Sequence, residues 1–448
     1  MRIKQHKSAT FEVRTDNTSI LSDPWFVDGE YYGAWYHVPP YRFDPREFDS
    51  VDAIYISHIH PDHMSRKTLE KLNKGIPVYI HRYESPFLRK NIEELDFKVV
   101  EVENGKSVRI GDDLVLSIYA ADNCDPEKCG KFFGCAPVEV RFGSTQIDSL
   151  SVISDGTHNI LNVNDCPYAL CVHTLDLVIE KHGHIDFLLT GYGGAGPYPQ
   201  CFANLNEGEK LKKAKEKEAQ FIGQAERIIE KVRPSYFMPF AGTYILGGKL
   251  HRLNRYRGVP HILDAAAQLE KFCREKKLNS RGIVLSDRET FNLQTKQRSG
   301  GSPIWSKDRI DAYTEKELSD RLLEYERDPM PSLQELRSLS QRAFERFLGK
   351  SQSLGFTTQT KVVVPMVEGR TALLDLERKE INFMSREEAE KPNSLLVVEV
   401  DPRLLARLLK GPRFAHWNNA EIGSHITFKR RPDVFERGLY YCMSFFHA

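Results

Sequence analysis

Four side chains that commonly bind metal ions lie within six positions of the sequence: His58, His60, Asp62 and His63. They follow the apolar run Ile54-Tyr55-Ile56, which predicts a buried strand that ends in a loop. Side chains alternate along an extended segment, so His58 and His60 face the same way and can share one cation. Beyond the proline bend, Asp62 and His63 reach a second position beside it. This loop is therefore the candidate active site.

Two neighbouring cations held by such a loop could share a bridging water. A pair of this kind lowers the pKa of the bound water, polarises a substrate oxygen or, with iron, handles dioxygen. Histidines also occur in ordinary loops, but three of the chain's fifteen histidines fall within these six residues. The concentration of ligands favours a metal site.

Length and composition narrow the class of protein. A chain of 448 residues exceeds the size at which a single core stops growing, so we expect more than one domain. Hydrophobic residues make up 40% and charged residues 28%, which is typical of a soluble globular protein. The net charge of +1 gives no indication of nucleic acid or a membrane surface as a partner.

The N-terminal residues indicate where the protein is located in the cell, and the cysteine count indicates whether disulfides are expected. The N-terminal residues contain no apolar signal segment, and no apolar run is long enough to span a membrane, so we expect a cytoplasmic protein. Eight cysteines in so long a chain then predict thiols or metal ligands rather than a disulfide framework.

The pattern of elements predicts three parts. Residues 1–258 alternate strands and helices, with an antiparallel start over 8–24, a hairpin around Asp155-Gly156, a long charged helix over 205–233 and a buried strand over 236–240. Residues 259–350 read as a helical segment that completes or flanks this domain, with helices over 261–277 and 314–349 and a Gly/Ser-rich loop over 298–303. Residues 351–448, with strands and a helix over 402–410, predict a small α+β domain.

Two further segments each have two interpretations. Residues 25–45 are rich in Tyr, Trp, Gly and Pro and form either an aromatic-packed loop or a substrate-contacting wall near the metal loop. The glycine-rich residues 190–199 form either a structural turn or a substrate loop, without the strand and helix context of a nucleotide fingerprint.

Three cysteines, Cys124, Cys129 and Cys135, fall in one glycine-interrupted loop. With Cys166 or Cys171 as a fourth ligand they could hold zinc or an iron-sulfur cluster. Their spacing matches no established motif, so the alternative is a set of unrelated thiols, some of them buried. The histidines outside the main loop are expected to be ordinary surface or core residues: His158, His173, His182 and His184.

The loop from His58 to His63 matches the HxHxDH signature of the metallo-β-lactamase superfamily, and the chain resembles that superfamily. The resemblance implies an α/β fold, the αββα sandwich. Further segments, in order, resemble the metallo-β-lactamase-type module of the CMP-N-acetylneuraminate hydroxylase family. These segments are Asp23-Pro24-Trp25, residues 160–166, residues 191–199 and Met238-Pro239-Phe240-Ala241-Gly242. The similarity covers roughly residues 20 to 260.

The resemblance also implies a set of ligands. His58 and His60 would bind one metal ion, Asp62 and His63 the other, and Asp165 would bridge them. His251 is the nearest counterpart of the family's late histidine. Asp62 and Asp165 would then be the candidate catalytic carboxylates, and the two metal ions would be iron by preference, with zinc or manganese as alternatives.

Two departures from the family pattern bear on the chemistry. The histidine expected about twenty residues before the bridging aspartate is absent around Thr145. Asp122 or Asp148 could replace it. The sequence also lacks the Cys-x-His…Cys-x-x-His pair of a Rieske domain, so oxygenase chemistry would need an external electron donor or an electron-supplying substrate.

These observations favour an iron-dependent oxygenase that hydroxylates or N-oxygenates a small polar substrate, such as an amino sugar, a nucleotide sugar or an amine. The missing histidine counts against a zinc site that delivers hydroxide. The alternative is a metal-dependent hydrolase of a phosphodiester, lactone or amide bond, as is common in the superfamily. A third interpretation is a binding module with a degenerate site, which the intact loop ligands disfavour.

Overall fold

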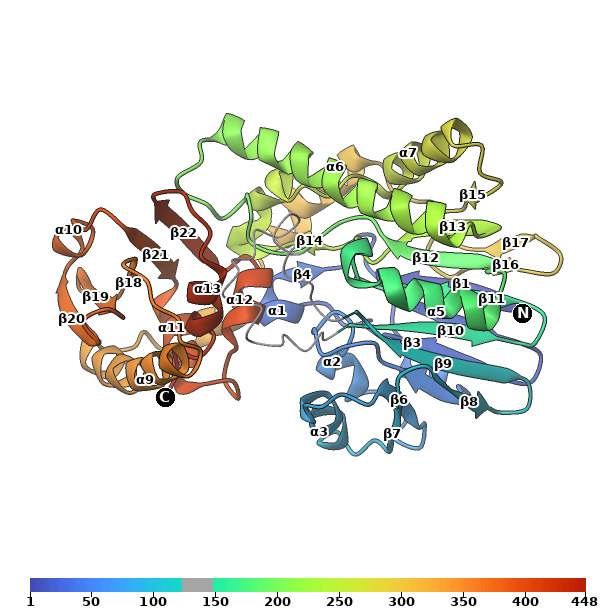
Figure 1. The fold of residues 1–448 in the computed structure, drawn as a ribbon, viewed down its shortest axis with the longest axis horizontal. Coiled ribbons are helices and arrows are strands. Elements are labelled where there is room, and N and C mark those ends of the chain that lie inside the picture. The colour runs from blue at the N-terminus through green and yellow to red at the C-terminus, as the bar shows by residue number, and fades with distance from the viewer. Residues whose placement is uncertain (123–147) are drawn as a thin grey trace.

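The computed structural model describes residues 1–122 and 148–448. Two β-sheets, built mostly from the first 300 residues, pack face to face (Figure 1). The first sheet has the strand order β17-β16-β1-β2-β3-β5-β6-β7. Its strands are β1 (Arg2–Lys7), β2 (Thr10–Arg14), β3 (Ser19–Ser22), β5 (Ala53–Tyr55), β6 (Val78–His81), β7 (Val99–Val102), β16 (Glu289–Asn292) and β17 (Arg298–Gly300).

The second sheet has the strand order β15-β13-β12-β11-β10-β9-β8. Its strands are β8 (Lys106–Ile110), β9 (Leu114–Ala120), β10 (Ser149–Ser154), β11 (Asn159–Asn162), β12 (Phe187–Gly191), β13 (Tyr236–Phe240) and β15 (Arg281–Gly282). The predicted hairpin is present, because β10 and β11 pair antiparallel on either side of Asp155-Gly156. Strands β11, β12 and β13 run parallel, and parallel strands covered on both faces require continuous apolar sequences.

Apolar side chains of both sheets fill the space between them. Phe11 and Ile20 of the first sheet join Ile118, Phe187 and Leu189 of the second in one buried cluster. Because successive side chains of a strand point to opposite faces, the intervening Leu188 belongs to a different cluster under the outer helices. The sandwich is therefore a packed double layer.

Helices cover the outer faces of both sheets. Those on the second sheet are α5 (Val172–His182), α6 (Glu207–Val232) and α7 (Ile262–Glu275), whose apolar sides share a core with that sheet. The shorter α2 (Arg66–Leu69) and α3 (Phe87–Glu93) cover the first sheet. The order of layers is helix, sheet, sheet, helix, which confirms the αββα sandwich expected from the sequence.

The sandwich continues beyond residue 258. Strand β16 pairs with β1 at the edge of the first sheet, and β15 extends the second sheet beside β13. The expectation of a plain loop over 298–303 was wrong in its first half, because Arg298–Gly300 forms strand β17 against β16. No helix of the described residues combines the length and apolar character needed to cross a membrane.

The helix expected over residues 314–349 is interrupted. Helix α8 (Lys307–Tyr313) runs into a π-helical turn, Thr314–Leu318, and the next regular helix is α9 (Leu333–Ser353). Pro329 and Pro331 lie just before it and disfavour a continuous helix because proline lacks an amide donor. Ser332 starts α9 by accepting a hydrogen bond from the amide of Glu335.

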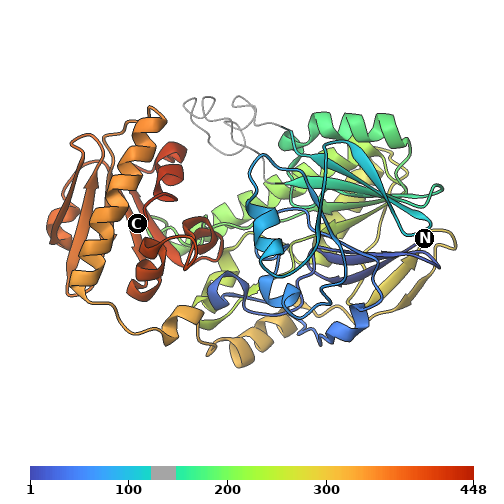
Figure 2. The same ribbon diagram turned by 90° about the horizontal axis from the view of Figure 1, so that it is seen from below.

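The C-terminal part is built on a five-stranded sheet of order β20-β19-β18-β21-β22. Its strands are β18 (Lys361–Pro365), β19 (Arg370–Asp375), β20 (Glu380–Ser385), β21 (Leu395–Val400) and β22 (Ile426–Arg431). Its helices are α10 (Arg386–Ala389), α11 (Pro402–Lys410), α12 (Trp417–Ile422) and α13 (Arg437–Met443), together with α9, which packs against α11 and α13. This part lies at one end of the sandwich (Figure 2).

The two parts share an apolar core. Helix α1 (Glu30–Gly33), within the aromatic segment 25–45, packs against α12. Tyr31, Trp35 and Tyr244 belong to the same buried cluster as the inner faces of α9, α11 and β21. The two-stranded pair β4 (Trp35–Tyr36) and β14 (Ile245–Leu246) fastens the aromatic segment to the chain that follows β13. The edge of the sandwich that carries the metal loop is therefore in contact with the C-terminal part.

Candidate metal centre

The metal-type loop follows β5, a strand held between β3 and β6 in the first sheet. The amides of His63 and Met64 both donate to the carbonyl of His60, which closes the loop into a tight turn. His58 and His63 are fully buried and Asp62 is nearly so. Nε2 of His58 lies 2.9 Å from Nδ1 of His60, so the structure brings these two rings together as the alternation of side chains predicts.

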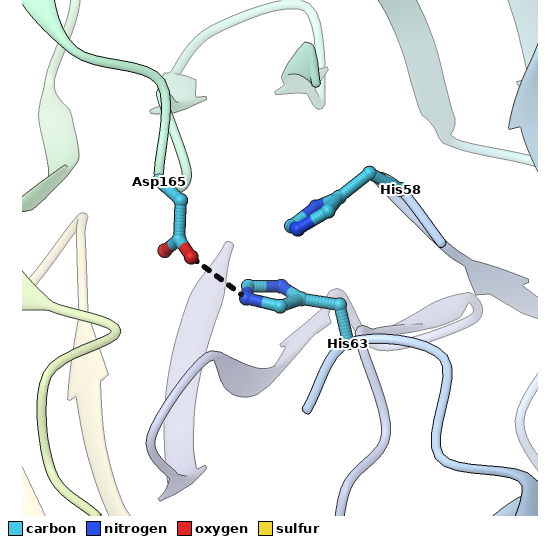
Figure 3. Close-up of side chains that lie close together, drawn as sticks. All are labelled: His58, His63 and Asp165. Carbon is cyan, nitrogen blue, oxygen red and sulfur yellow. Dashed lines mark hydrogen bonds and ion pairs between the residues drawn. The ribbon is translucent and has the colours of Figure 1, made fainter. Parts of the chain in front are cut away.

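Three potential ligands form a compact cluster. The ligating atoms of His58, His63 and Asp165 all lie within 4.8 Å of one another, and their side chains converge from two loops (Figure 3). Nε2 of His63 is 3.2 Å from Oδ2 of Asp165 and 3.4 Å from Oδ2 of Asp62. Asp165 follows β11 of the second sheet, so both sheets contribute to the cluster.

A buried carboxylate orients His63 from behind. Oδ2 of Asp23 lies 3.0 Å from Nδ1 of His63, and Asp23 also accepts hydrogen bonds from the amide and the hydroxyl of Ser57 at 2.7 Å each. A proton on Nδ1 leaves the Nε2 lone pair facing the cluster, which is the usual arrangement of a metal-bound histidine. Asp23 was part of the sequence resemblance, but its role as the partner of His63 was not predicted. Its position directly after β3, which pairs with β5, could have indicated that it lies near the metal loop.

Tyr31 plays a similar part for Asp62. Its hydroxyl donates to Oδ1 of Asp62 at 2.6 Å. Tyr31 lies in the aromatic segment 25–45, so this contact places part of that segment beside the metal loop. The same segment packs into the shared core, which confirms the aromatic-packed interpretation, while contact with a substrate stays a prediction.

The electrostatics of the cluster are dominated by burial and by carboxylates. Burial opposes the charged form of His63, but Asp165, Asp62 and Asp23 together raise its pKa well above the usual value. Burial, then the charges of His63 and His60, lower the pKa of His58 well below its usual value. His58 is therefore neutral and His63 balances the neighbouring negative charges.

Asp148, one of the two residues considered as a replacement for the missing third histidine, lies beside His58. Oδ1 of Asp148 lies 3.7 Å from Nδ1 of His58. Burial, followed by the charge of Asp165, raises the pKa of Asp148 to about 7. The other candidate, Asp122, instead accepts hydrogen bonds from the amides of His173 and Thr174 at 2.8 Å and caps the start of α5.

His251 does not join the cluster, contrary to its assignment as the late histidine. Its Nδ1 is 2.9 Å from the carbonyl of Gly248 and its Nε2 is 3.2 Å from Oε2 of Glu315. The reason is the pairing of β14 with β4, which draws the chain after β13 towards the aromatic segment before His251 is reached. Resemblance along the sequence could not reveal this local pairing.

The C-terminal part also reaches the metal loop. Nδ2 of Asn418, on α12, lies 3.5 Å from Nε2 of His60. Nothing in the sequence linked these residues, which are 358 positions apart. Cys166 and Cys171 are buried free thiols, while Cys124, Cys129 and Cys135 lie outside the described residues.

A family model matches the N-terminal part of the chain. Residues 18–198 match the family model described as the beta-lactamase superfamily domain. This match, with the αββα sandwich and the histidine-rich loop, makes residues 18–198 similar to that superfamily domain.

The chain is also similar to individual proteins of known name. It is 27% identical over 261 residues to a protein of Mycobacterium tuberculosis named as a Rieske 2Fe-2S iron-sulfur protein. This match covers 57% of this chain and 46% of the relative. It is 24% identical over 286 residues to the cytidine monophosphate-N-acetylneuraminic acid hydroxylase of Danio rerio, covering 61% of this chain and 42% of the relative. The chain thus spans less than half the length of these two relatives.

Among solved structures, CmlA, a diiron beta-hydroxylase from Streptomyces venezuelae, matches with a TM-score of 0.42 and 15% identity. That match covers 65% of this chain and 54% of CmlA.

Proposed function

We propose that this chain is a metal-dependent oxygenase that hydroxylates or N-oxygenates a small polar substrate, with two metal ions, preferably iron. The observation that carries the proposal is the donor set of the centre. It combines three imidazoles with three carboxylates, and we infer that one of these carboxylates, Asp148, replaces the histidine expected from the superfamily pattern.

The residues present fit a cationic group. His63 is within 3.4 Å of three carboxylates, Asp23, Asp62 and Asp165, and it is the buried imidazole that offsets their charge. Buried negative charges are costly unless a cation compensates them, and a bound metal ion can take the place of that proton. His58, His63 and Asp165 would hold one ion, with His60, Asp62 and Asp148 beside them.

The chemistry of the donors favours iron over zinc. Oxygen ligands in this number suit iron and manganese, as in the carboxylate-bridged centres of helical bundles, whereas hydroxide-delivering zinc sites use mostly histidines. When bound, iron supplies the capacity to react with dioxygen. Zinc and manganese remain the alternative ions of this proposal.

The chain's own residues prepare the centre. Asp23 keeps the proton of His63 on Nδ1, so that Nε2 is free to bind a metal ion. Tyr31 fixes the orientation of Asp62 through a 2.6 Å hydrogen bond, and Asn418 closes the side of His60. Asp62 and Asp165, the candidate catalytic carboxylates, therefore lie at defined positions next to the reacting space.

The substrate class is proposed from the relatives. One relative bears the name of a hydroxylase that acts on a nucleotide-linked sugar acid, which supports an amino sugar, a nucleotide sugar or an amine as substrate. An external electron donor and a cytoplasmic location belong to the same proposal, with neither nucleic acid nor a membrane as partner.

Anaerobic purification followed by metal analysis tests the proposal, with oxygen uptake measured over a panel of amines, amino sugars and nucleotide sugars in the presence of a chemical reductant. We expect bound iron and substrate-dependent oxygen consumption. Asp165→Asn should lose both the iron and the oxygen consumption. Asp186→Asn should lose neither, because Asp186 lies before the start of β12 and Asp165 lies after the end of the neighbouring β11. Stoichiometric zinc, no iron and no oxygen uptake would refute the oxygenase, and turnover of generic phosphodiesters would then identify a hydrolase.

A further inference from the structure

A large cavity lies beside the metal centre but is separate from it. Its volume is about 930 Å³, which is in the range of pockets for small molecules. It is bounded by the end of β1, the chain that follows β13, the 3₁₀ segment Gly248–Tyr256 and α8. None of the six residues proposed to bind metal lines it.

Arg257 contributes an uncompensated positive charge to this cavity. Its side chain is 7% exposed, and an Nη1 donates to the carbonyl of Tyr244 at 2.6 Å. Its Nε has no hydrogen-bond partner, and no carboxylate of the described residues lies within ion-pair distance of it. A buried guanidinium is always protonated, so an unpaired one calls for an acceptor.

The acidic residues of the lining do not supply that acceptor. Asp287 pairs with Lys7 at 2.5 Å, Asp311 with Lys307 at 2.5 Å and Glu315 with His251 at 3.2 Å. The remaining two, Glu207 and Glu218, lie on α6, where the first is exposed and the second half-buried. Among the described lining residues, the most deeply buried charge without an ion-pair partner is therefore that of Arg257.

A second basic group, Lys217, lies close enough to Arg257 to feel its positive charge. Burial, then the charge of Arg257, lowers the pKa of Lys217 to about 7. The Lys217 ammonium donates to the carbonyl of Tyr198 at 3.0 Å, and no carboxylate in the described part of the chain pairs with it. Neither basic group has a carboxylate partner among the described residues, which makes this part of the interior attractive to an anion.

The other lining residues indicate what the rest of the ligand would contact. Met238, Leu285 and Trp305 offer apolar surface. Gln5 is 5% exposed, its Nε2 donates to the carbonyl of Ser8, and its Oε1 has no partner, so it can accept a hydrogen bond from a ligand hydroxyl or amine. Pockets of this kind combine apolar walls with a few buried polar groups that fix orientation.

We infer that this cavity binds a small organic anion, whose carboxylate or phosphate group is held by Arg257 and whose body lies against the apolar walls. The planar guanidinium matches the geometry of both oxyanions. This site goes beyond the proposed oxygenase activity, because anion binding requires none of the metal ligands.

The cavity is nevertheless in contact with the metal centre through aromatic side chains. The ring of Tyr244 lies under the Arg257 guanidinium and stacks on Trp35 with centroids 3.4 Å apart. Trp35 is 4.3 Å from the ring of Tyr31, whose hydroxyl holds Asp62. A ligand at Arg257 would therefore stiffen the wall that positions a metal ligand.

Isothermal titration of the full chain with phenyl phosphate, benzoate and the neutral benzamide tests the inference. We expect at least one of the two anions to bind with a dissociation constant of about 1 mM or below, and benzamide to bind much more weakly. The anion that binds more tightly identifies the headgroup. Arg257→Gln should weaken binding by at least about tenfold, as expected for a lost charged hydrogen bond.

Matched variants separate binding at Arg257 from nonspecific attraction of anions to the protein surface. Arg252→Gln, an exposed arginine of the same lining, should leave affinity unchanged, and Asp165→Asn should still bind the anion although metal is lost. If Arg257→Gln does not fold, Arg257→Lys keeps the charge and should still weaken binding. Binding of neither anion, equal binding of benzamide, or equal losses in the Arg257 and Arg252 variants would overturn the inference.

Discussion

Acidification should weaken the contact between the two parts of the chain through one buried histidine, His425. It precedes β22 and is 7% exposed. Its Nε2 lies 2.7 Å from the carbonyl of Tyr31 and its Nδ1 lies 3.1 Å from the hydroxyl of Tyr325. A carbonyl can only accept, so Nε2 carries the proton, and the neutral ring then accepts from Tyr325. Protonation would remove this acceptor.

The size and sign of the effect follow from the pKa. Burial lowers the pKa of His425 to about 4, from 6.5 for an ordinary histidine. Between these values the unfolded chain binds a proton that the folded chain does not, so stability falls as the pH falls. The stabilisation that the neutral His425 provides is complete above pH 6.5 and is lost as the pH drops towards about 4. A shift of this size corresponds to about 3 kcal/mol.

Urea unfolding of the wild type and of His425→Gln, at several pH values from about 7 to about 4, measures this contribution. We expect the free energy of unfolding of the wild type to exceed that of the variant at neutral pH, and the difference to shrink by about 3 kcal/mol in acid. His184→Gln, at an exposed position, should keep the pH dependence of the wild type. An unchanged pH dependence in His425→Gln would refute the reasoning.

Three further changes test other contacts. Asp148→Ala should reduce the metal content of the purified protein, whereas Asp122→Ala should leave the metal in place and cost about 1 kcal/mol through the cap of α5; equal metal content in both variants would contradict the placement of Asp148. Tyr31→Phe removes the hydrogen bond to Asp62, so chelator competition should show metal affinity falling by about tenfold, and unchanged affinity would mean that Asp62 needs no support. Leu336→Ala empties a fully buried position of α9 and should lower the free energy of unfolding by about 2 to 5 kcal/mol, with a loss below about 1 kcal/mol arguing against the shared core.

Local sequence signals located several elements well. Helix α11 occupies residues 402–410 as predicted, because Asp401 caps it, Pro402 starts it and Gly411 follows it. The hairpin of β10 and β11 forms around Asp155-Gly156, and α6 begins after the cap residue Asn206. Each of these signals acts within a few residues of the element that it determines. The helix expected across Pro329 and Pro331 was wrong because periodicity was followed past a local signal that opposes a helix.

The sequence by itself determined the metal loop. His58, His60, Asp62 and His63 are close in space because they are close in the chain and follow a buried strand. The parallel strand pairing of an αββα sandwich then brings the end of β11, and hence Asp165, to the same edge. This much follows from local spacing and from a recognisable fold.

Only the tertiary structure decided which distant side chains complete the site. Asp23, Tyr31 and Asn418 reach the loop from separate elements, and the pairing of β14 with β4 directs His251 elsewhere. Such contacts depend on long-range packing between the sandwich and the C-terminal part, and no local pattern of residue types encodes them. Arg257 likewise has no ion-pair partner among the described residues, and only the tertiary structure could show this.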